Sequence, residues 1–260
     1  MRAAVFSDVH GNLPALEAVL AAAREREVDE VWIVGDLVAH GPQPAETVQR
    51  LKALPSARIV RGNTDRYVLT GDLSGLIPSL DQPRSPEAVR ALVAATSAHA
   101  WTRGCITAPG GYDWLDALPI ERRLVLPDGT RTLLVHASPG RDDGPGITDT
   151  MTDDELAANG WPTADADLVF VGHTHRPLDR VVGSMRVINL GSVSVPATPE
   201  RGAMWTFLEA TADGITLERC VAPYDMDAVF TALDAVHHPS GEWLKRKFAS
   251  TASPDDEEPS

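Results

Sequence analysis

Cysteine is scarce in this sequence of 260 residues, in which only Cys105 and Cys220 occur. The two cysteines lie far apart and form no CxxC pattern, so no disulfide framework is implied and a reducing compartment is expected. Long apolar runs are also missing, and the apolar run that follows Met1 is too short for a signal peptide. We therefore expect a soluble cytoplasmic protein with no membrane partner.

Positive charge is in short supply, because 23 Lys and Arg residues face 37 Asp and Glu residues and leave a net charge of −14. A nucleic-acid backbone or an anionic membrane attracts a basic face, so stable nucleic-acid binding is not expected. An anionic substrate is still compatible with this charge, because bound divalent cations invert the local field. Part of the acidity lies in residues 246–260, a Ser- and Pro-containing tail that we expect to be disordered.

Apolar strand patterns alternate with helical patterns at the start of the chain. Strands are expected over residues 3–7, 30–34 and 57–60, with helices beginning near Leu13 and Ala45. This alternation predicts an α/β fold with a mostly parallel sheet, whose strands place their carboxyl ends at a ligand-binding crevice. From Ile120 onward the pattern turns to β, and a last helix is expected over residues 226–236.

Residues 66–118 interrupt this rhythm, because they contain helical patterns but no convincing strand. We interpret them as a helical cap inserted into one domain of residues 1–245. The aromatic side chains Tyr67, Trp101 and Trp114 in the cap are expected to pack rather than to contact substrate. The sequence is equally compatible with a monomer and a dimer.

Residues able to bind a divalent metal through oxygen or nitrogen follow most of the expected strands. Taken singly, each has an ordinary alternative as a helix cap, a turn residue or a buried core histidine. Together they suit two metals with Asp36 as a bridging ligand. Asp8, His10 and His175 would hold one metal, and Asn63, His136 and His173 would hold the other. Mixed carboxylate, amide and imidazole ligands favour Mn, Fe or Zn over Ca. The set comprises Asp8, His10, Asp36, Asn63, His136, His173 and His175.

Five motifs containing these residues resemble those of the calcineurin-like metallophosphoesterases, and the resemblance covers nearly all of residues 1–225. It is strongest toward the small bacterial and archaeal phosphodiesterase-type members. The resemblance implies a four-layer αββα sandwich, in which two mixed β-sheets face each other and helices cover the outside. It also implies the ligand set above and two divalent transition-metal ions, with Mn expected and Fe, Zn, Ni or Co as alternatives. The motifs are Asp8-x-His10, Gly35-Asp36, Gly62-Asn63-x-Asp65, His136 and Gly172-His173-x-His175.

The hypothesis for function is a dimetal-dependent phosphoesterase that acts on a small phosphate ester. Two metals about 4 Å apart would clamp phosphate oxygens, and a hydroxide bridging them would attack phosphorus. Asp36 and Asn63 would serve as catalytic ligands, and Asp65 would orient Asn63 rather than bind metal. Arg66 and Arg176 would offset developing charge on the substrate, unless they are solvated surface groups.

One residue departs from the family pattern, because Thr64 stands where many members carry a histidine that protonates the leaving group. A threonine hydroxyl is a poor general acid at neutral pH, so we expect a phosphodiesterase acting on activated or nucleotide-like diesters. His40 could supply the missing acid, which would favour a phosphomonoesterase or phosphoprotein phosphatase instead. The remaining alternative is a non-catalytic metal-binding module on the same fold. No role is assigned to His99.

Overall fold

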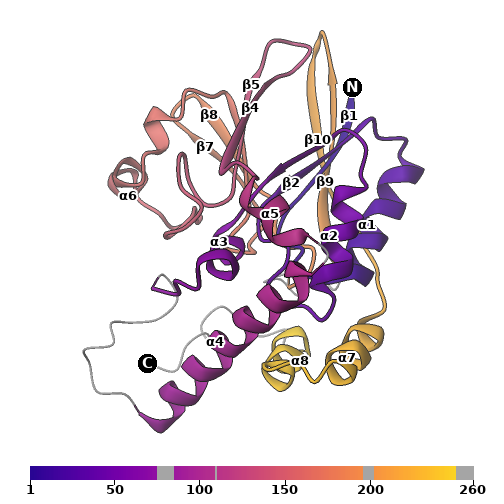
Figure 1. Ribbon diagram of the computed structural model, residues 1–260. Helices are drawn as coiled ribbons and strands as arrows, with labels where there is room; N and C mark the ends of the chain where they lie inside the picture. Colours follow the sequence, from indigo (N-terminus) through magenta and orange to yellow (C-terminus); the bar gives the residue numbers. More distant parts are fainter. Residues whose placement is uncertain (75–84, 109, 196–201, 250–260) are drawn as a thin grey trace.

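A computed structural model describes residues 1–74, 85–108, 110–195 and 202–249, and Figure 1 shows its two sheets with helices around them. The first sheet has five strands in the order β10-β9-β1-β2-β3, of which β1, β2 and β3 run parallel. Strand β9 pairs antiparallel with β1 and with β10. The strand bounds are β1 (Arg2–Phe6), β2 (Glu30–Val34), β3 (Ala57–Val60), β9 (Ala203–Thr211) and β10 (Gly214–Ala222).

The second sheet also has five strands, in the order β4-β5-β6-β8-β7. Strands β5, β6 and β8 run parallel, and an antiparallel strand flanks them on each side. Both sheets are therefore mixed. The bounds are β4 (Glu121–Val125), β5 (Arg131–Val135), β6 (Leu168–Val171), β7 (Leu178–Val182) and β8 (Met185–Asn189).

Apolar side chains from both sheets form a core between them. Trp32 of β2 and Phe170 of β6 meet edge to face, with ring centroids 6.2 Å apart. Val5, Leu134 and other fully buried residues of the two sheets fill the same layer. Residues on alternate positions of each strand face this layer, while the intervening residues face the outer helices.

Helices cover the outer faces of the two sheets and complete four layers. On the first sheet lie α1 (Leu13–Glu25) and α2 (Pro44–Lys52), whose apolar sides share a core with β1 and β2. The Asn12 side chain caps α1 by accepting a hydrogen bond from the Ala15 amide at 3.1 Å. The second sheet is covered by α6 (Asp153–Ala158) and a 3₁₀ helix, Trp161–Thr163. The predicted sandwich of two mixed sheets flanked by helices is confirmed.

In the region expected to form a cap, the described residues form helices joined by turns and contain no strand. It contains most of α3 (Asn63–Thr70), together with α4 (Pro86–Thr107) and α5 (Gly111–Asp116). Figure 1 shows that the start of α4 extends away from both sheets, whereas its second half returns to the body. Helix α3 already begins at Asn63, so residue 66 falls inside a helix. The division of the chain into domains stays a prediction.

Two helices end the described part of the chain, and only the first was expected. Helix α7 (Met226–Ala235) packs on α8 (Gly241–Ala249) through Val229, Leu233 and Leu244. Residues 246–249, assigned above to a disordered tail, therefore form the end of α8, and residues 250–260 lie outside the described residues. Among the described residues, the helices are all too short or too polar to cross a bilayer.

Candidate metal centre

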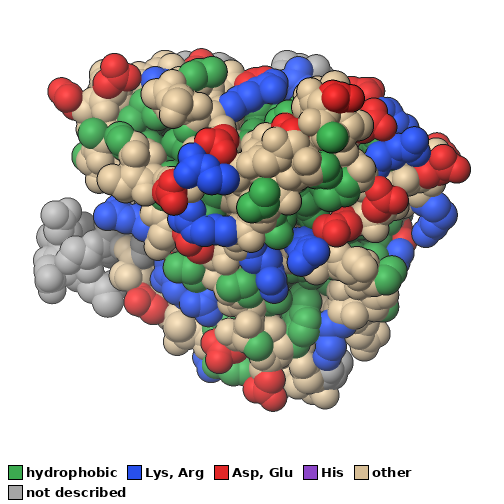
Figure 2. All heavy atoms as spheres, turned by 90° about the horizontal axis from the view of Figure 1, so that it is seen from above, with side chains coloured by type: hydrophobic (Ala, Val, Ile, Leu, Met, Phe, Trp, Pro, Cys, Tyr) green, Lys and Arg blue, Asp and Glu red, His purple; other side chains and the backbone are tan. Residues whose placement is uncertain are grey.

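The seven candidate ligands lie at the carboxyl ends of β1, β2, β3, β5 and β6, where the two sheets open toward α3 and α4. Because these strands are parallel within each sheet, their ends share one edge. Figure 2 shows the molecule from above, where basic and acidic side chains are interspersed and no histidine is visible.

Asp8 uses its two carboxylate oxygens differently. Oδ2 accepts hydrogen bonds from the Ser7 hydroxyl at 2.5 Å and from the His173 amide at 3.2 Å. Oδ1 is buried, has no hydrogen-bond partner among the described residues, and lies 3.1 Å from Nε2 of His175 and 3.7 Å from Nε2 of His10. One oxygen therefore fixes the side chain, and the other is left for an electropositive ligand.

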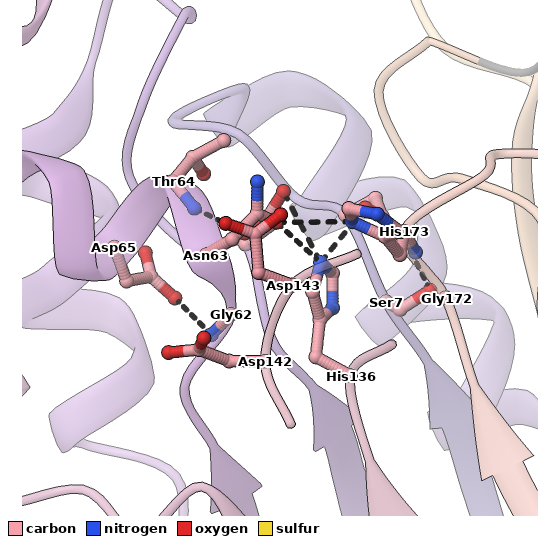
Figure 3. Close-up of polar contacts among 12 residues, drawn as sticks. Ser7, Gly62, Asn63, Thr64, Asp65, His136, Asp142, Asp143, Gly172 and His173 are labelled. Carbon is pink, nitrogen blue, oxygen red and sulfur yellow. Dashed lines mark hydrogen bonds and ion pairs between the residues drawn. The ribbon is translucent and has the colours of Figure 1, made fainter. Parts of the chain in front are cut away.

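Asp36 likewise has one oxygen fixed by a hydrogen bond and one that faces the site, and Asn63 directs its amide oxygen to the same place. Asp36 Oδ1 accepts from the Thr64 amide at 3.0 Å, while Oδ2 lies 3.3 Å from His136 Nε2 and 3.8 Å from His10 Nε2. Asp36 thus stands between the two sets of candidate ligands. Asn63 Oδ1 lies 3.1 Å from His136 Nε2 and 3.1 Å from His173 Nδ1, and Figure 3 shows these three side chains converging.

Three of the imidazoles are held by their outward nitrogen. His136 Nδ1 lies 2.8 Å from the Val34 carbonyl, His173 Nε2 lies 2.6 Å from the Gly144 carbonyl, and His175 Nδ1 lies 2.9 Å from the Val195 carbonyl. A carbonyl can only accept, so each of these nitrogens carries the proton. In the neutral ring, the opposite nitrogen then presents a lone pair to the site, which is the arrangement of metal-binding histidines.

The inward atoms of the site are therefore mostly acceptors that face other acceptors, and they need a positive charge between them. Two carboxylate-histidine groups have ligand atoms within 4.8 Å of one another: Asp8, His10 and His175, and Asp8, Asp36 and His136. Burial opposes the charged form of His136, but Asp36 and then Asp8 raise its pKa to about 10, so a proton on this ring supplies the positive charge where no cation does. Burial also acts against the Asp36 carboxylate, yet His136 holds the pKa of Asp36 well below its usual range. This donor set fits divalent cations.

Five of the seven residues have backbone in the left-handed region, which L-residues other than glycine seldom adopt. Such a conformation costs about 1–2 kcal/mol per residue, and it is typical of functional sites, where the surrounding structure enforces it. The values of φ are 59° for Asp8, 49° for His10, 55° for Asp36, 70° for His173 and 57° for His175.

Glycines before two of the ligands allow close approach between strand ends. A Cβ atom at Gly62 would lie 2.1 Å from Asp36 Oδ1, and one at Gly172 would lie 2.3 Å from Asp8 Oδ2. Neither carboxylate can retreat without losing its place in the site. The Gly62-Asn63 and Gly172-His173 motifs therefore have a steric reason: only glycine leaves room for the neighbouring aspartate.

Asp65 is close to the site but faces away from its centre. Its Oδ1 accepts from the amides of Leu37 and Val38 at 2.9 and 3.3 Å, and its Oδ2 accepts from the Gly62 amide at 2.9 Å. Figure 3 shows Asp65 pointing toward Gly62. Burial and then Asp36 raise the pKa of Asp65 to about 7. Asp65 thus ties the loop after β2 to the start of α3, which places Asp36 beside Asn63.

Thr64 and His40 occupy the side of the site toward the helices. The Thr64 hydroxyl is buried without a hydrogen-bond partner among the described residues. The ring of His40 lies 4.9 Å from that of His10 and 5.5 Å from that of His99, measured between centroids. Burial lowers the pKa of His40 well below its ordinary value, so the neutral ring predominates near pH 7.

The two candidate substrate arginines differ in their surroundings. Arg66 of α3 pairs with Asp142 at 3.0 Å and with Asp143 at 2.8 Å, and Tyr67 donates to the same Asp143 oxygen at 2.5 Å. Arg176 is exposed, directly after His175. Sequence reasoning missed Asp142 and Asp143, because their partners on α3 are distant in sequence.

Comparison with known proteins places this geometry in a family. The family model described as "Calcineurin-like phosphoesterase superfamily domain" matches residues 1–212, which is most of the chain. The chain therefore belongs to the calcineurin-like phosphoesterase superfamily, as its motifs predicted. Two solved structures share the fold over 97% of this chain. A hypothetical protein of Pyrococcus horikoshii has a TM-score of 0.78 at 20% identity and is covered over 99% of its length. A metallophosphoesterase of Sphaerobacter thermophilus has a TM-score of 0.71 at 28% identity and is covered completely, at 100%.

Curated relatives match over shorter stretches. An uncharacterized protein of Methanocaldococcus jannaschii is 32% identical over 179 residues, which are 67% of this chain and 62% of that protein. A protein of Psychromonas ingrahamii named bis(5'-nucleosyl)-tetraphosphatase, symmetrical, is 43% identical over 67 residues, which are 25% of this chain and 24% of that protein. The chain thus spans less than two thirds of the length of either relative.

Proposed function

We propose that the protein is a dimetal-dependent phosphodiesterase. The observation that carries this proposal is the convergence of Asp8, Asp36 and Asn63 with four imidazoles whose outward nitrogens are already hydrogen-bonded or buried. Membership of the calcineurin-like phosphoesterase superfamily supports the same chemistry. Two bound divalent cations, with Mn expected, would supply positive charge to the phosphate oxygens and lower the pKa of a water molecule.

The proposed ligand sets follow the distances between side chains. Asp8, His10 and His175 would hold one cation, because their ligand atoms lie within 4.8 Å of one another. Asn63, His136 and His173 would hold the other, because the amide oxygen lies 3.1 Å from both imidazole nitrogens. Asp36, whose Oδ2 faces both His10 and His136, would bridge them.

The remaining residues of the site would position these ligands or the substrate. Asp65 would orient Asn63 through the Gly62 amide rather than bind metal. Arg66, fixed by Asp142 and Asp143, is proposed to contact the substrate, and exposed Arg176 is the second candidate.

The preference for a diester rests on Thr64. A hydroxyl at this position does not protonate a leaving alkoxide, so fast turnover needs a leaving group that is stable as an anion. The partial match to a protein named as a tetraphosphatase supports a small nucleotide-like substrate.

Phosphomonoesterase activity is a second candidate, because His40 lies beside His10. The lowered pKa of His40 counts against it, since a general acid must carry its proton at the working pH.

Hydrolysis of bis(p-nitrophenyl) phosphate and of p-nitrophenyl phosphate, with added Mn²⁺ and with chelator, tests the proposal. Chelator-sensitive cleavage that favours the diester supports a phosphodiesterase. A preference for the monoester, abolished by His40→Gln, would instead support the phosphomonoesterase. If neither ester turns over although Mn²⁺ is bound, the non-catalytic metal-binding module is the better account.

A further inference from the structure

A pocket lined by three arginines adjoins the candidate metal centre. Its volume is about 610 Å³, and Arg61, Arg66 and Arg141 line it together with residues 140–144. Arg61 and Arg66 flank Asn63 in the sequence. On the other wall, the Gly144 carbonyl accepts the hydrogen bond from His173. One wall residue of the pocket therefore contacts the candidate ligand His173, and Asn63 lies between two of the pocket arginines in the sequence.

Both acidic side chains of this pocket form ion pairs with the same arginine, Arg66. Asp142 and Asp143 pair with Nε and Nη2 of Arg66, and Tyr67 also donates to Asp143. This arrangement holds the guanidinium of Arg66 in one orientation. Arg61 and Arg141 lie outside the pairing, so the pocket keeps cationic groups that its own carboxylates do not engage.

Arg61 has a donor without an acceptor. Its Nε is buried and has no hydrogen-bond partner among the described residues, and its Nη1 reaches only the exposed Asp116, at 3.7 Å. The guanidinium of Arg61 is therefore incompletely paired within the protein, and an anionic oxygen in the pocket would add an acceptor for it. The planar fork of donors on arginine matches the oxygens of a phosphate group.

An anion in this pocket would lie next to a phosphate bound at the metal centre. The chemical unit with two such neighbouring anions is a phosphoanhydride. In its hydrolysis, a water oxygen forms a bond to the attacked phosphorus, and the bridging P–O bond breaks. The electron pair stays on the bridging oxygen, which leaves as a phosphate oxygen, and the proton lost by water passes to solvent. A phosphate leaving group is stable as an anion at neutral pH, so a site with Thr64 in place of an acid suffices.

We infer that the arginine pocket, formed by Arg61, Arg66 and Arg141, binds the phosphate adjacent to the scissile one, and that the substrate is a nucleotide-like phosphoanhydride. This inference rests on the proposed function, because it assumes that the metal centre hydrolyses phosphate esters. It adds the substrate class and assigns binding roles to Arg61 and Arg141.

The test compares two substrates on the full-length Mn²⁺-loaded protein, diadenosine tetraphosphate with its anhydride bonds and bis(p-nitrophenyl) phosphate without them. Arg61→Ala and Arg141→Ala should each lower the ratio of kcat/KM for the tetraphosphate to that for the diester at least tenfold. Arg186→Ala, which removes an exposed arginine that pairs with Asp179 on β7, is the matched control and should leave the ratio unchanged. Calorimetry adds a readout that is independent of turnover. The ratio of the affinity for methylenebisphosphonate to that for methylphosphonate should be at least tenfold lower in the two pocket variants than in the wild type.

The outcomes separate the two proposals. If the protein cleaves the simple diester but not the tetraphosphate, or if neither pocket variant changes the ratio, the inference is overturned while the proposed function holds. If neither substrate is cleaved, the proposed function fails, and the bisphosphonate preference decides the pocket. Loss of that preference in both variants supports the arginine pocket, and an unchanged preference rejects it.

Discussion

Nε2 of His10 lies 3.1 Å from Nε2 of His175, and Asp8 Oδ1 lies 3.1 Å from the same His175 nitrogen. His175 keeps the proton on its other nitrogen for the Val195 carbonyl, so at neutral charge it offers His10 a lone pair. Burial lowers the pKa of His10 to about 4, so its ring is neutral near pH 7, whereas burial opposes the charged form of His175 but Asp8 raises its pKa. A cation that both rings and the Asp8 carboxylate can ligate is therefore expected to stabilise this arrangement.

Metal removal should destabilise the fold. A ligand that binds only the native state at about 100 times its Kd adds about 2.7 kcal/mol to the free energy of unfolding. For a chain of this size, that amounts to a Tm increase of roughly 5–10 °C. Thermal unfolding of chelator-treated protein, with and without Mn²⁺, measures the shift. An identical Tm at saturating Mn²⁺ would argue against the site.

Replacing His173 with alanine should abolish hydrolysis and bring little unfolding, because the ring is partly exposed at the site and its main role is ligation. Metal content and kcat on bis(p-nitrophenyl) phosphate are the readouts, with circular dichroism to check folding. His237→Ala is the matched control, since His237 is exposed on the turn after α7. Activity that survives His173→Ala would mean that the site has been placed wrongly.

Asp65→Ala should lower the free energy of unfolding by about 2–4 kcal/mol, because it removes the acceptor of three buried amides. Urea denaturation measures the loss. Asp225→Ala removes the side-chain cap of α7, a single hydrogen bond, and should cost only about 1 kcal/mol. Equal losses in the two variants would show that Asp65 does not tie the β2 loop to α3. Asp65→Ala should also weaken Mn²⁺ binding.

His238, at the junction of α7 and α8, should make stability depend on pH. Burial lowers its pKa from the ordinary histidine value of about 6.5 to about 4, and its ring packs edge-on against Trp101 with centroids 4.8 Å apart. Between pH 6.5 and 4 the His238 ring is protonated in the unfolded state but stays neutral in the folded state. The free energy of unfolding therefore falls as pH falls through this window. The expected loss from pH 7 to pH 5 is about 1–2 kcal/mol. Thermal unfolding of the wild type and of His238→Gln should diverge in this way, and parallel pH profiles would refute the assignment.

The sequence was sufficient to predict most strands and to group the candidate ligands, because Asp, His and Asn residues follow several apolar runs of an α/β pattern, although each of them alone has an ordinary alternative. Asp8, Asp36 and His136 each follow such a run, and the sheet topology then brings them to one edge. The left-handed backbone at Asp8 and His10 was not predictable, since it is imposed by strand ends that pack from elsewhere in the chain.

Other features depended on partners far away in sequence. In the sequence, Asp142 and Asp143 are typical of a polar loop. Only the structure shows that Arg66 and Tyr67 of α3 contact them. Helix α8 was missed because its apolar residues are few, although Leu244 and Phe248 have helical spacing. His99, left without a role, is buried beside His40 and Tyr67.

The most direct test of the central claim is to titrate chelator-treated protein with Mn²⁺ while following hydrolysis of bis(p-nitrophenyl) phosphate. A dimetal phosphodiesterase should be inactive without metal and should recover full activity at two equivalents of Mn²⁺ per chain. Hydrolysis that persists without metal, or Mn²⁺ binding at two equivalents with no turnover of the diester, would contradict it.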